Sequence, residues 1–173
     1  ILFIVDEVQT GVGRTGTFYS YQQFGIQPDL VSSAKGLGGG LPIGAVLFGE
    51  KTQDTLIPGD HGSTFGGNPV VCAGAVEVLN RMDDTFLQNV TAKGRHMREE
   101  IEKMPHVTSV AGMGMMLGIE LDIDVKPVVT ALMENGLLVL TAKHKMRLLP
   151  PLNIAQTELE KGLSILKNTL AAL

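Results

Sequence analysis

The chain has 173 residues, enough for one domain of ordinary size or parts of two. Hydrophobic residues make up 44% and the formal net charge is −4, so a packed core is expected and no basic cluster favours nucleic acid as a partner. The single cysteine, Cys72, excludes an internal disulfide framework, and no apolar run is long enough for a membrane span. Cysteine usage is compatible with a reducing cytoplasm, where we expect the protein to reside.

The first predicted element is a buried strand. Residues 1–5 are continuously apolar, which is typical of a parallel strand covered on both faces. The sequence opens with neither an initiator Met nor a charged leader, so we expect it to be a piece of a longer protein. Further strands are predicted over residues 29–32 and 43–48, with a glycine-rich segment, 35–40, between them.

Two helices are predicted next. Asn68 suits an N-cap and Pro69 suits the first turn, so a helix should begin there. A second helix should begin near Asp83 and stop before Pro105. The change of pattern after the first helix predicts a domain boundary near residue 83.

Residues 83–173 then read as a small α+β domain. Strands are predicted over 107–111, 115–121 and 137–140, and a helix over 127–135. Thr157 and Glu160 predict a capping box at the start of a last helix. That helix should pack one stripe of leucines against the sheet: Leu159, Leu163, Leu166, Leu170 and Leu173.

Two motifs in the first forty residues point to nucleotides. Residues 11–16 spell GxGxxG, but a dinucleotide-binding turn must follow its strand directly and open a helix, and residues 6–10 intervene here. Four apolar residues followed by Asp6 and Glu7 resemble a Walker B strand, yet the chain has no GxxxxGK[ST] loop to hold phosphates. A nucleotide-hydrolysing or binding module therefore stays open as an alternative of another class.

A third pattern combines Asp6 with Lys35. Each follows a predicted strand, and glycines follow the lysine. A lone lysine is normally a solvated surface charge, but the small, apolar neighbours of Lys35 predict partial burial, which suits Schiff-base chemistry. A carboxylate such as Asp6 can keep a pyridine nitrogen protonated, and the glycines let the backbone approach a cofactor closely.

Four segments together resemble the signature of the class III pyridoxal-phosphate (PLP) aminotransferases: residues 3–11, 14–16, 29–30 and 34–40. The resemblance implies an α/β fold of the aspartate-aminotransferase type. Residues 1–82 would be the end of the large, parallel-sheet PLP-binding domain, and residues 83–173 the small C-terminal α+β domain. The resemblance covers essentially all of this chain, which corresponds to only the C-terminal part of a chain of the family.

The same resemblance assigns roles around the cofactor. Lys35 would hold PLP as an imine and then act as the acid and base that moves the proton. Asp6 would pair with the pyridine nitrogen, Val8 would pack on the ring, and Gln9 would reach the ring hydroxyl. Glu7 is carried over as a cofactor-binding residue, with fixing the loop as an equally good alternative.

Two later segments add to the resemblance. Residues 61–69 resemble the segment that reaches the partner subunit's active site in ornithine and acetylornithine aminotransferases, which implies a homodimer with a shared site. Thr64 would then bind the cofactor phosphate and Ser63 would lie near the substrate, although read alone the pair is an ordinary turn. Arg147, in the apolar segment 146–152, could form a structural ion pair; the resemblance favours a substrate carboxylate.

Some features depart from the family or carry no signal. Ala111 stands where the family often has arginine, which puts one small-domain contact in doubt, and the loop over residues 141–145 looks short. The four histidines are scattered and show no metal-binding pattern, so no metal is expected.

The reaction implied is amino transfer between N-acetylornithine and 2-oxoglutarate, in arginine biosynthesis. Sister enzymes acting on ornithine, succinylornithine or 4-aminobutyrate are the alternatives. The expected partners are a small-molecule amino donor and a 2-oxo acid, with neither nucleic acid nor a membrane. We expect the 173 residues alone to be inactive and to hold PLP weakly, because a phosphate-binding glycine turn and a ring-stacking aromatic are not found here.

Overall fold

The computed structural model describes residues 1–173, and the chain divides into two compact units, residues 1–88 and 89–173. Helix α2 (Asp84–Ile101) passes from the first unit into the second. The boundary predicted near residue 83 falls just before this helix. None of the helices combines the length and the apolar character needed to cross a bilayer.

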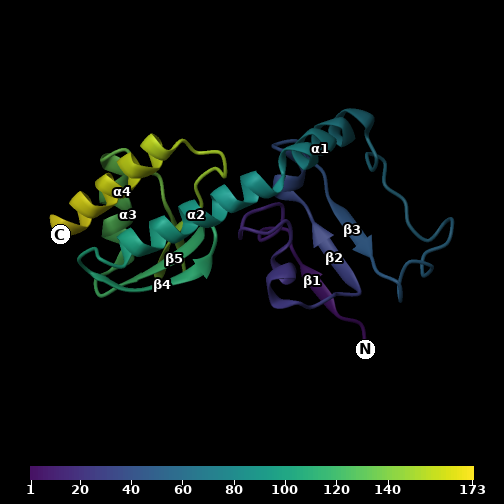
Figure 1. Ribbon diagram of the computed structural model, residues 1–173, viewed down its shortest axis with the longest axis horizontal. Helices are drawn as coiled ribbons and strands as arrows, with labels where there is room; N and C mark the ends of the chain where they lie inside the picture. Colours follow the sequence, from purple (N-terminus) through teal and green to yellow (C-terminus); the bar gives the residue numbers. More distant parts are fainter. The chain divides into compact units, whose positions relative to one another are not determined.

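The first unit contains a three-stranded sheet in the order β1-β2-β3, formed by Ile4–Asp6, Leu30–Ser33 and Ala45–Phe48. β1 and β2 are parallel, whereas β3 runs antiparallel to β2 (Figure 1). The antiparallel third strand departs from the parallel sheet that the sequence predicted. The connection between β2 and β3 is too short for the crossover that parallel strands need.

Residues 1–173 alone do not supply the cover on both faces that the first strand is expected to have. Ile4 is 62% exposed, and all four residues of β3 are exposed. The core of the unit lies instead where the loop after β1, the turn after β2 and helix α1 meet. Its buried members are Val12, Leu37 and Ala75, with Ile43, Val78 and Met82 packed against them.

Helix α1 (Pro69–Arg81) begins where its cap chemistry predicts. The side-chain oxygen of Asn68 accepts hydrogen bonds from the backbone N–H groups of Val70 and Val71, at 3.1 and 3.3 Å. Proline follows at the first helical position, where its missing N–H costs nothing. The helix packs against the short 3-10 helix η2 (Lys35–Gly38), so it supports the turn that carries Lys35.

The second unit contains a four-stranded antiparallel sheet in the order β4-β5-β7-β6. Its strands are β4 (Val107–Met113), β5 (Met116–Leu121), β6 (Leu140–Ala142) and β7 (Lys145–Leu148), and its other helices are α3 (Val125–Glu134) and α4 (Gln156–Ala171). Alternate residues of the inner strands are buried, including Leu117 and Ile119 on β5 and Met146 on β7. Figure 1 shows the helices of this unit lying beside the sheet.

Three predictions in this unit need correction. The capping box is wrong, because α4 begins at Gln156 and Thr157 lies inside the helix, while Glu160 accepts a hydrogen bond from Gln156 and contacts His96. The strand predicted over 137–140 begins only at Leu140. Leu173 lies beyond the end of α4 and is 55% exposed, whereas the other four leucines of the stripe are buried.

Candidate active site

The parallel pairing of β1 and β2 brings Asp6 next to Ser32. The two residues are opposite each other in register, and the Ser32 hydroxyl donates a hydrogen bond to Asp6 Oδ1 at 2.9 Å. The backbone N–H of Val8 donates to the same oxygen, also at 2.9 Å. These two bonds, with a smaller contribution from the positive charge of Lys35, hold the pKa of Asp6 below its usual value. Asp6 is therefore ionised at neutral pH.

Lys35 lies three residues beyond Ser32, at the same edge of the sheet, because the carboxyl ends of parallel strands meet there. Its backbone is left-handed, with φ of 47°. Non-glycine residues rarely adopt this conformation, and those that do are concentrated at functional sites. The side chain is exposed, so the partial burial predicted from its neighbours is wrong: Gly36, which follows it, and the turn glycines beyond offer no side chain to cover it.

The loop after β1 is fixed by Glu7, which is only 1% exposed. One carboxylate oxygen accepts from the hydroxyl of Thr10 at 2.5 Å, and the other accepts from the backbone N–H of Tyr21 at 2.9 Å. Both oxygens are thus engaged within the loop. The structure favours the loop-fixing role of Glu7 over the cofactor-binding role.

The remaining residues assigned to the cofactor lie in two places. Val8 and Gln9 follow Asp6 directly and are half-buried. Ser63 and Thr64 lie in an exposed loop, where the hydroxyl of Ser63 accepts from the backbone N–H of Gly66 at 3.0 Å. The chain's own fold brings Val8 and Gln9 together with Asp6, and gives Ser63 and Thr64 no contact with it.

Arg147 lies on β7 of the second unit, opposite Gly118 of β5 and Leu140 of β6. Its Nε atom is buried and has no hydrogen-bond partner. No carboxylate of the chain lies within salt-bridge distance of it, so the structural ion pair that the sequence left open is not formed. A buried donor without a partner is costly, which favours an acceptor from outside the chain.

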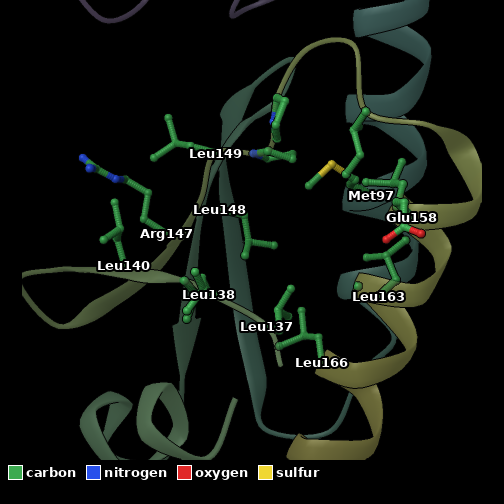
Figure 2. A pocket seen from close by; sticks show the side chains of 16 residues that line it. Met97, Leu137, Leu138, Leu140, Arg147, Leu148, Leu149, Glu158, Leu163 and Leu166 are labelled. Carbon is green, nitrogen blue, oxygen red and sulfur yellow. The ribbon is translucent and has the colours of Figure 1, made fainter. Parts of the chain in front are cut away.

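The same unit contains a pocket of about 290 Å³, lined mainly by leucines and prolines. Figure 2 shows the guanidinium of Arg147 directed away from Leu163 and Leu166 on the opposite wall. Glu158 is the only acidic side chain that lines it. The lining of this pocket is otherwise apolar, apart from Arg147 and Glu158.

Sequence reasoning missed the role of Ser32. Its hydroxyl is the side-chain donor that orients the Asp6 carboxylate. The signal was present in the two strand predictions, because aligning 1–5 and 29–32 as parallel neighbours places the two residues within reach. The hydrogen bond between Ser32 and Asp6 cannot be predicted without the register of β1 and β2.

Comparison with known proteins identifies the family. Residues 1–170 match the family described as aminotransferase class-III. The chain belongs to the class III aminotransferases. Membership of this family agrees with the strand-end positions of Asp6 and Lys35, and it leaves no support for a nucleotide-hydrolysing module.

Relatives within the family are similar over nearly the whole chain. An acetylornithine aminotransferase of Haemophilus ducreyi is 53% identical over 99% of this chain and 44% of its own length. Another acetylornithine aminotransferase, of Listeria innocua, is 47% identical over 98% of this chain and 46% of its own length. The chain thus spans less than half the length of the relatives it matches.

Solved structures of the family confirm the aspartate-aminotransferase-like α/β fold. An ornithine aminotransferase of Toxoplasma gondii is 36% identical with a TM-score of 0.92, over 99% of this chain and 44% of its own. An acetylornithine aminotransferase of Elizabethkingia anophelis is also 36% identical, with a TM-score of 0.90, over 100% of this chain and 48% of its own. One structure of the Toxoplasma protein is described as having partial occupancy of PLP at its active site.

Proposed function

We propose that the full-length protein transfers an amino group between N-acetylornithine and 2-oxoglutarate, with PLP as cofactor and Lys35 as the residue that holds it. The observation that carries this proposal is the pairing of β1 with β2, which sets an ionised carboxylate beside the turn that bears the lysine. Relatives named acetylornithine aminotransferase, 53% and 47% identical to the chain, support the choice of donor.

The residues present fit the chemistry of PLP. Both hydrogen bonds to Asp6 go to Oδ1, which leaves Oδ2 for the N–H of a pyridine ring. The depressed pKa keeps this carboxylate charged, so it can hold a proton on the ring nitrogen. Lys35 supplies a primary amine that forms no ion pair within the chain. Val8 and Gln9 follow Asp6 directly and would contact the ring.

When bound, PLP supplies an aldehyde that an amine can hold and a ring that accepts electrons from the substrate carbon. Asp6 keeps the ring nitrogen protonated and therefore sets how well the ring accepts those electrons. Lys35 Nζ would hold the cofactor and, once free, would take up the proton of the substrate α-carbon as a general base and give it back as a general acid. Ser32 and the N–H of Val8 fix the orientation of the Asp6 carboxylate.

The loop that bears Ser63 and Thr64 would reach into the active site of a second subunit. Its exposure, and its lack of contact with Asp6, support a role across a homodimer interface. Thr64 would bind the cofactor phosphate there, since a hydroxyl among glycine backbone N–H groups suits an anion. Residues 1–82 would belong to the large domain and residues 83–173 to the small domain of a cytoplasmic enzyme.

Replacement of the lysine tests the proposal. In the full-length protein, Lys35→Ala should abolish amino transfer and the visible absorbance of lysine-bound PLP, because the amine is lost. The matched control is Lys51→Ala, which removes an exposed lysine of the same unit that pairs with Asp29 at 2.9 Å. Persistence of the absorbance band in Lys35→Ala, or its loss in Lys51→Ala, would contradict the assignment.

Arg147 tests the substrate part of the proposal. Arg147→Lys keeps the charge but cannot copy the two-pronged contact with a carboxylate, so kcat/KM should fall by about 10- to 100-fold. Thermal stability should change little, since Arg147 has no ion-pair partner to lose. Steady-state rates with N-acetylornithine, ornithine, succinylornithine and 4-aminobutyrate would decide the donor; an unchanged kcat/KM with all four would refute the carboxylate role.

A further inference from the structure

We propose that Val12 is a positioning residue for Lys35, acting through the backbone of Gly36; this rests on the role proposed for Lys35. Val12 is 3% exposed and has φ of 53°. A β-branched side chain in the left-handed region is a true outlier, because its methyl groups crowd the backbone. A conformation this unfavourable persists only where the surrounding contacts hold it.

The contact between Val12 and Gly36 links the two halves of the site. A Cβ atom added to Gly36 would lie 3.3 Å from Val12 Cβ and 3.6 Å from Val12 Cγ1. Gly36 directly follows Lys35, whose own backbone is left-handed. The valine side chain therefore packs on the peptide that carries the lysine, and limits how far that peptide can move.

The loop that carries Val12 is itself held tightly. The N–H of Gly11 donates to the Glu7 carbonyl at 2.9 Å, and the N–H of Gly13 donates to the Phe18 carbonyl at 3.1 Å. Gly11 has no room for a side chain, since a Cβ there would lie 2.7 Å from the Glu7 carbonyl oxygen. Because this loop continues directly from β1, Val12 transmits the position of the Asp6 strand to the Lys35 turn.

Val78 supplies a matched control. Its Cγ2 lies 2.8 Å from where a Cβ of Gly39 would be, so it packs on the far end of the same turn. It lies on helix α1, and its backbone is not in the left-handed region. Both valines therefore pack on a glycine of the turn, but only Val12 contacts the residue next to Lys35.

The experiment uses the full-length protein and three variants: Val12→Gly, Gly36→Ala and Val78→Ala. Glycine at position 12 accepts the positive φ and removes the contact, while alanine at position 36 adds a methyl that pushes against Val12. The readouts are the pH midpoint of the visible absorbance of lysine-bound PLP, the rate at which the apoenzyme captures PLP, kcat, and the melting temperature.

Val12→Gly and Gly36→Ala should each shift the absorbance midpoint, slow PLP capture and lower kcat by on the order of 10- to 100-fold. Combining the two should restore much of the loss, because the added methyl occupies the space that the valine leaves. Val78→Ala should lower the melting temperature and leave the midpoint and capture rate unchanged. If Val12→Gly fails to fold, the midpoint of Gly36→Ala decides alone.

Wild-type midpoints and capture rates in Val12→Gly and Gly36→Ala would overturn the positioning role. So would an equal midpoint shift in Val78→Ala, which would mean that any loosening of the turn has the same effect. Lys35→Ala, measured in parallel, separates the two proposals. If it retains the lysine-bound absorbance, the proposed function has failed; if it loses that absorbance while the Val12 variants behave as wild type, only the positioning role has failed.

Discussion

The two units of the chain differ in how they are built. Of the large side chains that are less than 2% exposed, all but Glu7 lie in the unit formed by residues 89–173. The unit formed by residues 1–88 exposes apolar side chains on its strands, among them Val46 at 56% and Phe48 at 41%. The one fully buried large side chain of the first unit is an acid that organises a loop, not an apolar core residue.

The two units also differ in where their tightly packed contacts lie. The second unit closes an apolar core of its own, whereas the first unit concentrates its tight contacts around the loop after β1 and the turn after β2. These two segments bear Asp6 and Lys35, and they contain the left-handed valine and lysine. We therefore expect variants of these two segments to affect activity, and variants of the apolar core of the second unit to affect folding.

Among the variants that compare the two units, Asp6→Asn should give the largest effect, a loss of turnover. The amide keeps the shape of the side chain but cannot hold the proton on the ring nitrogen, so kcat should fall by about 10²- to 10⁴-fold while PLP still binds. Steady-state kinetics and a PLP titration of the full-length protein measure both. Near-normal turnover would remove Asp6 from the mechanism.

The lowered pKa of Asp6 also predicts a pH dependence. A depressed carboxyl pKa in the folded state means that the favourable contacts of the ionised group are present at neutral pH and are lost as the pH falls through that pKa. The contribution of Asp6 to activity should therefore persist to below about pH 4, the usual range of an aspartate. An acid limb caused by Asp6 above pH 5 would contradict the hydrogen bonds that Val8 and Ser32 donate to it.

Leu132→Ala should give the next largest effect, on folding. Leu132 is fully buried on α3, so its truncation should lower the free energy of unfolding of the 173-residue chain by about 2–5 kcal/mol. Leu47→Ala, at a β3 position that is 41% exposed, should stay within about 0.5 kcal/mol of the parent chain. Urea denaturation followed by circular dichroism compares the two, and equal losses would break the contrast between the units.

The smallest effect is expected at Thr157. This residue lies inside α4 and caps nothing, so Thr157→Ala should change the free energy of unfolding by less than about 0.5 kcal/mol. Asn68→Ala removes a cap that the structure does contain and should cost about 1 kcal/mol. If Thr157→Ala lowered the free energy of unfolding as much as Asn68→Ala, Thr157 would be a cap, as the sequence predicted.

Local chemistry explains which parts of the fold could be predicted. The cap at Asn68 and the strand ends at Asp6 and Lys35 depend on residues that are neighbours in the sequence. The capping box failed because its pattern also occurs in helix interiors, where Glu160 found other partners in Gln156 and His96. The strand predicted over 137–140 begins only at Leu140 for a similar reason, since apolar residues without a pairing partner do not fix where a strand begins.

Two features of the candidate site could not be predicted from the sequence. The family resemblance points to Asp6 and Lys35, whereas the hydroxyl of Ser32 and the packing of Val12 depend on register and on backbone conformation. Neither can be predicted from a short motif. The contact of Ser32 with Asp6 depends on the parallel pairing of β1 with β2, and a valine does not predict a positive φ. The exposure of Lys35 does not follow from its small, apolar neighbours, because glycines supply no side chain to cover it.

Chemical trapping of the cofactor tests the central claim most directly. The full-length protein is incubated with PLP, reduced with borohydride, digested, and its peptides are examined by mass spectrometry for a pyridoxyl group fixed to lysine. We expect the group on Lys35, in the peptide that continues through Gly36–Gly40. A pyridoxyl group on another lysine of the chain, with Lys35 unmodified, would contradict it.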